Sequence, residues 1–431
     1  MTDTVRPFDE YPYLALPIDW TAPERLATAS RLHGGPAPGL SGARVLELGC
    51  ANGANLIPMA WFRGDEDFTG LDGSARQIER ARAGARHLGL ENLRFHQADF
   101  AGSDAVLEGR YDFIIVHGVL SWIDEANRQR LLRLCAKRLA PGGLLYLNYN
   151  CRPGWNVRGL VRAFLLRHTA GAGDLEARAN RARELAVQVI EPLAAEEHAW
   201  TSLMANEFRI VSRNHPAYIA HEYLAPENVA WWRSEFEAMV AAHGLETVAE
   251  ADYASTSQRI TGQLTGLLEG GGLERRQVDD SVDLLLYRQM HSPVLTHAGF
   301  DRRPPGDGEF GAFHVAACLA PVDGGAEGAQ DFRHPEGHEV EVRDPAIRDA
   351  LLALREAWPR SRRIGDLLAA DGEWREDVEY LARSGLARLL VAEPRDVERD
   401  PAPLHAYEAG LRGFVTDAYH DAHPVTVEKE S

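Results

Sequence analysis

Two glycines and two acidic residues follow three successive apolar runs of the chain. Gly49 and Gly53 end the first run and precede an apolar, helix-like segment. This is the pattern of a buried strand, a tight turn and a helix whose free N–H groups face a ligand. Asp72 ends the second run, and Asp99 opens the loop after the third. Since a carboxylate at the tip of the second strand suits the two hydroxyls of a ribose, the spacing predicts a nucleoside-binding site.

The spacing of the glycine turn separates three kinds of cofactor. A phosphate-gripping loop needs G-x-x-x-x-G-K-[ST], and no lysine lies near the turn. A dinucleotide-binding turn prefers G-x-G-x-x-G, whereas residues 49–53 read GCANG, with Glu47 two residues earlier. The remaining candidate is S-adenosyl-L-methionine (SAM), a nucleoside that carries an amino-acid tail. On this interpretation the turn passes the methionine moiety, Asp72 holds the ribose, and Asp99 and Phe100 take the adenine.

The elements that position these residues alternate between strand and helix from 43 to about 170. Strands spaced by helices require right-handed crossovers, so the order predicts a doubly wound, Rossmann-like α/β sheet with helices on both faces. The expected strands are 44–48, 67–71, 93–97, 112–116 and 143–149, and the expected helices lie near 53–62, 74–88, 127–139 and 156–168. Two later apolar runs, 245–249 and 293–295, are expected to add a sixth and a seventh strand.

The other segments are expected to surround this core. The predicted domains are 1–42, an N-terminal cap segment and helix; 43–170, the SAM-binding core; 171–226, a helical insertion (regulatory or lid region) that ends in the loop NHPAYIAHEYLAPEN; 227–304, a return to the core; and 305–431, a C-terminal winged-helix-like α+β domain. In the last domain the third-helix region is acidic, which favours a structural or protein-contact role over DNA binding. Its acidic residues are Asp371, Glu373, Glu376, Asp377 and Glu379.

Composition limits the partners. The 431 residues carry a net charge of −18, which disfavours nucleic acid because phosphate binding needs a basic surface. The polar, acidic N-terminus and the absence of a run of about 18 apolar residues predict neither a secretory signal nor a membrane helix. Cys50, Cys135, Cys151 and Cys318 lack C-x-x-C spacing and fit reduced thiols of a cytoplasmic protein. No metal site is expected.

Residues 43–150 resemble a class I SAM-dependent methyltransferase. The family's motif E-x-G-x-G is present as ELGCA, with Ala51 at its last position; the ribose motif is GLD at 70–72, the adenine motif is QADF at 97–100, and the fourth strand reads YDFIIVHGVLSWI. More narrowly, residues 11–300 resemble bacterial methyltransferases that carry a methyltransferase regulatory domain, some of which methylate lysine side chains of proteins. The stretches TAPERLATASRLHG, NLIPMA, HGVLSWI, LNYNCRPGW, HEYLAPEN and RQMHSPVLTH carry this closer resemblance.

The chemistry of methyl transfer indicates the candidate site residues. The acceptor must be held in near-attack geometry, an amine acceptor must lose a proton, and aromatic faces stabilise cations. The candidate cofactor-binding residues are Glu47, Gly49, Cys50, Asn52, Gly53, Asn55, Asp72, Gln77, Asp99, Phe100, His117, Gly118 and Trp122. The candidate catalytic residues are His117, Tyr149, His221, Glu222 and Tyr223, and the candidate substrate-binding residues are Tyr11, Tyr13, Asn150 and Trp155.

Three functions fit these residues. The first is N-methylation of a protein or peptide with a lysine-like amine, in which the insertion covers the acceptor and the C-terminal domain recruits it or forms a homodimer. The second is O- or N-methylation of a small natural product, and the third is SAM-dependent regulation without catalysis. Methyltransferases that act on the amino groups of bases and glutamine carry N-P-P-[YF] after the fourth strand. Residues 117–120 read HGVL there, which excludes that subclass.

Overall fold

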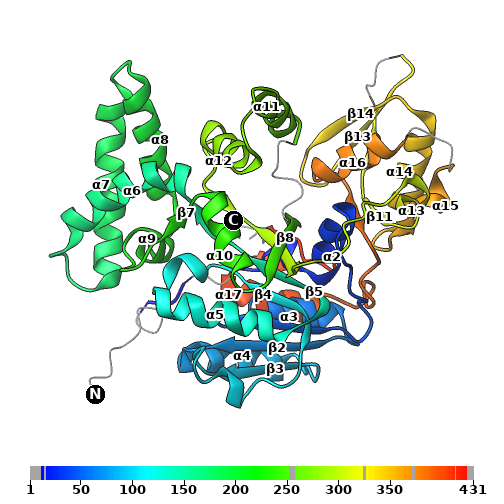
Figure 1. Cartoon of the computed structure of the whole chain (residues 1–431). Helices are drawn as coiled ribbons and strands as arrows, with labels where there is room; N and C mark the ends of the chain where they lie inside the picture. The colour runs from blue at the N-terminus through cyan, green and yellow to red at the C-terminus, as the bar shows by residue number, and fades with distance from the viewer. Residues whose placement is uncertain are drawn as a thin grey trace, which may run out of the picture.

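A seven-stranded mixed sheet forms the centre of the molecule (Figure 1). The computed structural model describes residues 11–13, 16–251, 258–323, 327–369, 374–412 and 414–424. The strand order is β3-β2-β1-β4-β5-β10-β8. The strands are β1 (Arg44–Leu48), β2 (Asp67–Asp72), β3 (Leu93–Gln97), β4 (Tyr111–Val116), β5 (Leu139–Leu147), β8 (Leu245–Glu250) and β10 (Pro293–His297). β1 to β5 are parallel, and β10 is antiparallel to both of its neighbours. The predicted Rossmann-like sheet with its sixth and seventh strands is confirmed.

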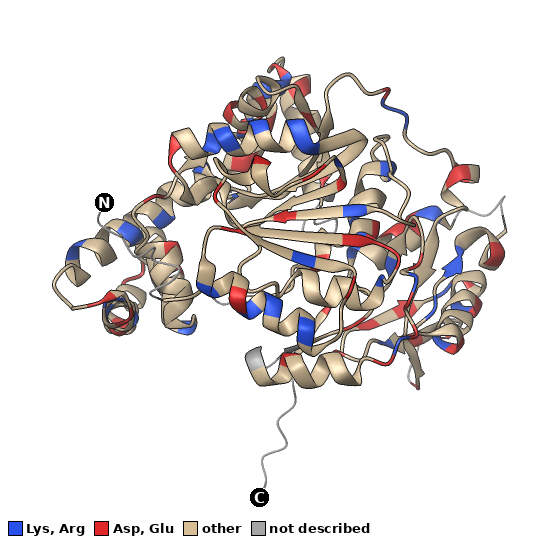
Figure 2. Ribbon diagram, turned by 90° about the horizontal axis from the view of Figure 1, so that it is seen from below, with Lys and Arg blue, Asp and Glu red and all other residues tan. Residues whose placement is uncertain are grey.

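Successive side chains of the buried strands pack alternately into two hydrophobic cores, one on each face of the sheet. Val45 packs with α2 (Pro23–Leu32), α3 (Leu56–Phe62) and α4 (Ala75–His87) on one face. The next residue, Leu46, packs with α5 (Glu125–Arg138) and α10 (Arg233–Ala241) on the other. Figure 2 shows helices on both faces of this sheet. Because side chains of a strand point alternately to opposite faces, a nearly continuous apolar strand is what such a two-sided burial requires.

A helical lobe follows the sheet and projects to the left in Figure 1. It contains α6 (Arg152–Thr169), α7 (Leu175–Ala194), α8 (Ala199–Arg213) and α9 (Pro216–Tyr223). The loop predicted at the end of the insertion is wrong in its central part, since Pro216 to Tyr223 are helical. Pro216 occupies the first turn, where its missing N–H is not needed, and the His215 side chain caps the helix by accepting from the Ala217 N–H at 3.1 Å.

The chain then returns to the core through short elements. A small sheet joins β7 (Ala230–Trp231), β6 (Tyr149–Cys151) and β9 (Met290–His291). Two helices, α11 (Gln258–Gly270) and α12 (Arg275–Leu285), lie between β8 and β9. Within the described part of the chain, no helix is both long enough and apolar enough to cross a membrane.

The C-terminal α+β region has a core of its own. Its strands are β11 (His314–Ala316), β12 (Ala320–Val322), β13 (Gln330–Arg333), β14 (Glu339–Val342), β15 (Arg362–Arg363) and β16 (Arg388–Leu390), and its helices are α13 (Asp307–Phe310), α14 (Pro345–Ala357), α15 (Ile364–Leu367) and α16 (Arg375–Arg383). β16 pairs with β11, which precedes the helices, so the winged-helix order stays a prediction. On α16, Glu379 pairs with Arg375 and Arg383, whereas Asp371 and Glu373 lie outside the described residues.

The last described segment packs on the central sheet. It contains α17 (Ala402–Arg412), β17 (Phe414–Thr416) and β18 (Ala422–Pro424). Leu404, Ala418 and Tyr419 belong to the same core cluster as Val45 and Met59. The predicted domain 305–431 therefore requires a correction at its C-terminal end, because its last apolar side chains join the core cluster of the central sheet, although Tyr419 also contacts Trp358 of the C-terminal region.

Candidate active site

The glycine turn after β1 has a left-handed backbone at both of its glycines. Gly49 and Gly53 have φ of +83° and +78°, and a Cβ atom would lie 2.6 Å from Val119 at the first and 2.5 Å from Phe95 at the second. Ala51 occupies the motif's last glycine position and keeps a left-handed φ of +46°. That conformation costs an L-residue roughly 1–2 kcal/mol, so the turn retains its shape at a cost in strain.

Asp72 ties this turn to the next strand. Its Oδ2 atom accepts from the Ala51 N–H at 3.0 Å, and its Oδ1 atom accepts from the Ser74 N–H at 2.8 Å. The turn is also held by the Gly49 N–H, which donates to the Leu71 carbonyl at 2.7 Å. The carboxylate is therefore fixed at the tip of β2, beside the turn. At the tip of β3, Asp99 is exposed and accepts from the Gly102 N–H at 2.8 Å, with Phe100 half-buried next to it.

Several predicted cofactor residues lie behind the turn. Glu47, Cys50, Asn55 and Gln77 are all at most 5% exposed. Asn55 donates to Glu47 Oε1 at 3.0 Å and accepts from the Ile18 N–H at 2.9 Å. Burial raises the pKa of Glu47 to about 8, although the hydrogen bond from Asn55 opposes this rise. A direct contact between Asn55 and a cofactor is contradicted, because the amide is enclosed and engaged by protein groups; Asn55 supports the turn from behind.

His117 and Gly118 follow β4 as predicted. His117 Nδ1 lies 2.9 Å from Tyr146 Oη, which accepts from Trp20 Nε1 at 2.9 Å. The Tyr146 hydroxyl also lies 3.5 Å from Ser292 Oγ, to which it can donate, so it links Trp20, His117 and Ser292. Burial lowers the pKa of His117 to about 4, so the ring is neutral at pH 7. Gly118 donates from its N–H to Asn148 Oδ1 at 2.6 Å.

Aromatic rings connect the loop after β4 to the helical lobe. Trp122 contacts Trp155 of α6 edge-to-face at 5.7 Å between ring centroids, and Trp155 lies 6.4 Å from Tyr223 of α9. Glu222 is adjacent, with the Tyr13 hydroxyl donating to its Oε1 atom at 3.5 Å. The structure thus brings together Trp122, Trp155, Tyr223, Glu222 and Tyr13, which were predicted from four separate stretches of sequence.

Glu222 lies in a largely enclosed, aromatic environment. Burial raises its pKa to about 7, whereas the positive charge of Arg158 and the Tyr13 hydroxyl oppose the rise. Arg158 of α6 pairs with Glu207 of α8 at 3.3 Å. Tyr218 lies one turn before Glu222 on α9, and burial raises the pKa of its hydroxyl to about 12. We refer to Tyr13, Arg158, Tyr218, Glu222 and Tyr223 as the α9 cluster.

Two members of the α9 cluster were not predicted, and two predicted roles fail. Tyr218 was missed because the segment was interpreted as a loop; as a helix, its (i, i+4) spacing to Glu222 would have indicated it. Tyr149 is 2% exposed and stacks on Phe236 at 4.0 Å, so a catalytic role is contradicted because the ring is core. His221 is 6% exposed and donates from Nε2 to the Tyr11 carbonyl at 2.6 Å, which contradicts a role as a base.

The remaining predicted substrate residues also have structural contacts. Asn150 donates from its backbone N–H to Ser121 Oγ at 2.9 Å, and its side chain contacts Asn228 at 3.4 Å. These bonds join β6 to the loop after β4, which contains Ser121, and to the loop that leads to β7, which contains Asn228. Tyr11 contributes its carbonyl to His221. Asn52 accepts from the Ala54 N–H at 3.2 Å and thereby shapes the glycine turn.

Two family models match separate segments of this chain, and individual proteins resemble longer stretches of it. Residues 45–143 match the family model of a methyltransferase domain, and residues 215–264 match the model of a predicted methyltransferase regulatory domain. Uncharacterized protein RP789 of Rickettsia prowazekii is 32% identical over 249 residues, which are 58% of this chain and 45% of that protein. Uncharacterized protein RP028 of the same organism is 27% identical over 229 residues, 53% of this chain and 91% of that one. The chain therefore spans under half the length of the first relative.

A solved structure covers almost the whole fold. PKMT2 from Rickettsia typhi in complex with AdoHcy superposes with a TM-score of 0.79 over 96% of this chain and 86% of that chain, at 20% sequence identity. At that identity the likeness establishes the fold alone. Together with the family model, it confirms the predicted class: the chain carries a Rossmann-like, SAM-dependent methyltransferase domain. More particularly, this domain is followed by a methyltransferase regulatory domain that extends from α9 into α11.

Proposed function

We propose that this protein is a SAM-dependent N-methyltransferase that acts on an amine of a protein or peptide, with the lysine side chain as the model acceptor. The observation that carries the proposal is the placement of an acid-bearing aromatic cluster next to the loop that follows β4. When bound, SAM supplies a methyl group from its sulfonium to the acceptor nitrogen.

The turn after β1 fits the methyl donor. Asp72 is held beside the turn by two backbone N–H groups, which orients its carboxylate toward the two hydroxyls of a ribose. The exposed carboxylate of Asp99 and the half-buried ring of Phe100 stand at the tip of the neighbouring strand, where an adenine would lie. His117, neutral at pH 7, provides a polar side chain at the tip of β4 without adding a positive charge near a sulfonium.

The α9 cluster fits an amine acceptor. A lysine side chain has a pKa of about 10.4, so it reaches the site as an ammonium and must lose a proton before it can attack. Glu222, with a pKa near 7, accepts that proton, and the half-buried ring of Tyr218 favours the cationic form while it enters. Tyr223 and Trp155 are 0% and 6% exposed, so they pack as a buried aromatic wall beside this pair. The two roles together distinguish this cluster from a purely apolar wall.

The surrounding segments have proposed roles as well. We propose that the insertion at 171–226 covers the acceptor, and that the region after 305 recruits it or forms a homodimer. The four cysteines are unpaired thiols, which suits a protein of the reducing cytoplasm. Light scattering on the purified protein tests the homodimer.

Tritiated SAM tests the acceptor class. The protein and labelled SAM are incubated with one class of acceptor at a time. The classes are lysine-bearing peptides, arginine-matched peptides, and small hydroxy or amino metabolites. The chain itself contains only two lysines, Lys137 and Lys429, so self-labelling adds little background. We expect label in the lysine peptides and none in the arginine-matched set. Label only in small metabolites would refute the acceptor proposal and would favour a natural-product methyltransferase.

A further inference from the structure

The hairpin near the end of the chain reaches the back of the cofactor turn. β17 (Phe414–Thr416) pairs with β18 (Ala422–Pro424), and in the turn between them His420 has a left-handed φ of +67°. His420 is 1% exposed, although it stands in a hairpin turn. The hairpin packs against α17 and the core cluster that contains α3, so the turn is inserted into the molecule and not displayed on its surface.

His420 contacts the residue that supports the glycine turn. Its Nε2 atom lies 2.8 Å from Asn55 Oδ1. The same oxygen accepts from the Ile18 N–H at 2.9 Å, so Asn55 receives two hydrogen bonds from segments that lie outside the Rossmann-like fold. Because an amide oxygen can only accept, His420 donates from Nε2.

These two donors fix which way the Asn55 amide faces. With Oδ1 directed to His420 and Ile18, the Nδ2 group faces Glu47 and Thr21, where it donates to Glu47 Oε1 at 3.0 Å and to Thr21 Oγ1 at 3.1 Å. The second carboxylate oxygen of Glu47, Oε2, is buried and has no hydrogen-bond partner among the described residues. Glu47 sits two residues before Gly49, so its orientation is transmitted directly to the start of the cofactor turn.

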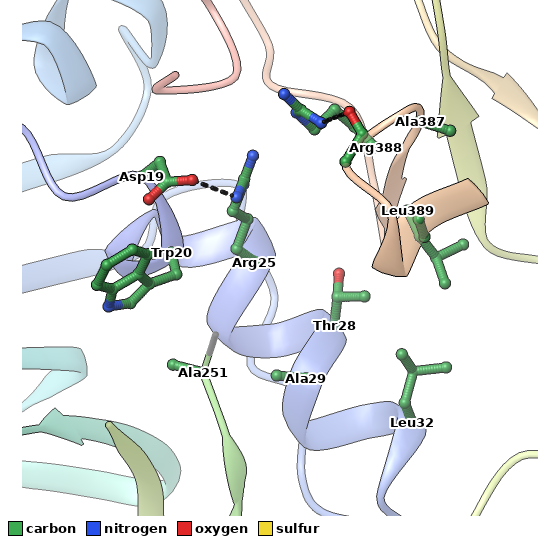
Figure 3. Close-up of a pocket in the computed structure, with 12 residues that line it drawn as sticks. Asp19, Trp20, Arg25, Thr28, Ala29, Leu32, Ala251, Ala387, Arg388 and Leu389 are labelled. Atoms are coloured by element: carbon green, nitrogen blue, oxygen red, sulfur yellow. Dashed lines mark hydrogen bonds and ion pairs between the residues drawn. The ribbon is translucent and has the colours of Figure 1, made fainter. Parts of the chain in front are cut away.

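The neighbouring residue anchors the hairpin to two other parts of the molecule. Asp421 pairs with Arg25 of α2 at 2.7 Å and with Arg388 of β16 at 2.5 Å. Arg25 and Arg388 line a cavity of about 170 Å³ between α2 and the C-terminal region. Figure 3 shows the two side chains on their separate elements. The hairpin is therefore held by the N-terminal helix and by the C-terminal region at once, next to its contact with Asn55.

We propose that His420 is a positioning residue for the methyl donor: through Asn55 it orients Glu47 and the turn at 49–53, and so sets the affinity for SAM. The inference rests on the proposed function, because it assigns the donor to that turn. It also gives the C-terminal segment a role in the cofactor site although no residue of that segment belongs to the methyltransferase motifs.

Substitution of His420 tests this role in the full-length chain. His420→Leu removes the donor, His420→Gln keeps an N–H donor on a side chain of similar reach, and His423→Leu is the matched control in the same hairpin, where His423 contacts Asp417 and not the core. SAM binding is measured by calorimetry, and KM for SAM and kcat by labelled transfer. We expect His420→Leu to raise Kd and KM for SAM about tenfold while kcat changes less than twofold, His420→Gln to recover most of the affinity, and His423→Leu to bind like the wild type.

The outcomes separate this inference from the proposed function. If the wild type does not bind SAM, the proposed function fails. If the wild type binds SAM and a folded His420→Leu chain binds it equally well, or if His423→Leu loses as much affinity, only the role of His420 fails. If His420→Leu does not fold, His420→Ser carries the same expectation, because serine is polar but too short to reach Asn55. If no variant without the Nε2 donor folds, His420 serves folding alone and the proposal is overturned.

Discussion

The proton acceptor of the proposed reaction predicts a distinctive pH profile. Burial raises the pKa of Glu222 to about 7. If the ionised carboxylate takes the proton of an incoming lysine ammonium, the rate depends on ionised Glu222 together with protonated amine. The value of kcat/KM should then rise about tenfold per pH unit below 7 and level off between about 7 and 10.

Glu222→Gln should change the shape of this profile as well as its height. Without the carboxylate the amine must arrive neutral, and at pH 7 the neutral fraction of a lysine with a pKa of about 10.4 is roughly 1 in 2,500. We therefore expect a loss of about 10³ in kcat/KM at pH 7, within the range of about 10²–10⁴ that general-base catalysis contributes. Above pH 7 the variant should continue to gain about tenfold per pH unit, so the difference from the wild type should shrink.

Labelled transfer to a lysine peptide, measured from pH 5.5 to 9.5, provides the assay. Glu207→Gln is a suitable control, because Glu207 pairs with Arg158 in the same region but does not contact the Tyr13–Glu222 pair. A Glu222→Gln profile that levels off near pH 7 like the wild type, or a loss below tenfold at pH 7, would refute the reasoning.

Other substitutions test the turn and its supports. Asp72→Ala removes the acceptor of two backbone N–H groups, and calorimetry should show at least a hundredfold loss of SAM affinity. Gly53→Ala imposes φ of +78° on an L-residue and places Cβ 2.5 Å from Phe95, so urea unfolding should show a loss of about 2–4 kcal/mol. Glu24→Gln leaves the fully buried Arg63 without its carboxylate partner and should cost about 3–5 kcal/mol in the same assay. Glu47 has a raised pKa of about 8 in the folded chain, so it binds a proton more tightly when the chain is folded. Its contribution to stability is fully present below pH 4.5 and should be lost as the pH rises toward 8. The thermal midpoint should therefore fall over this range in the wild type, and Glu47→Gln should remove that fall.

The positions of the candidate donor-binding residues at the strand ends could be predicted because their sequence signal is local. Gly49, Gly53, Asp72 and Asp99 all follow buried strands directly, and parallel strands bring their carboxyl ends to one edge of the sheet. Ala51 shows the limit of motif reading: the motif lacks its last glycine, yet the turn keeps the left-handed conformation. Such a compensation depends on the hydrogen bond from the Ala51 N–H to Asp72, which is 21 residues away.

The acceptor side and the chain ends were harder to predict. The stretch NHPAYIAHEYLAPEN was interpreted as a loop, although Pro216 starts α9 within it, and this concealed the spacing of Tyr218 and Glu222. Tyr149 follows a strand end like a ligand-binding residue, but its stacking on Phe236 comes from a segment more than 80 residues later. Likewise, nothing in the local sequence of His420 indicates Asn55, because the contact spans 365 positions. Contacts between residues so far apart along the chain leave no periodic pattern in the sequence.

The central claim is tested most directly by mass spectrometry of methylated species. The protein is incubated with SAM that carries a heavy methyl group and with a lysate of its source organism, and Asp72→Ala serves as the inactive control. We predict heavy methyl groups on lysine side-chain nitrogens of one or a few proteins or peptides, which are absent with Asp72→Ala. Heavy methyl groups found only on small metabolites or on hydroxyl oxygens, or on nothing at all while SAM binds, would contradict it.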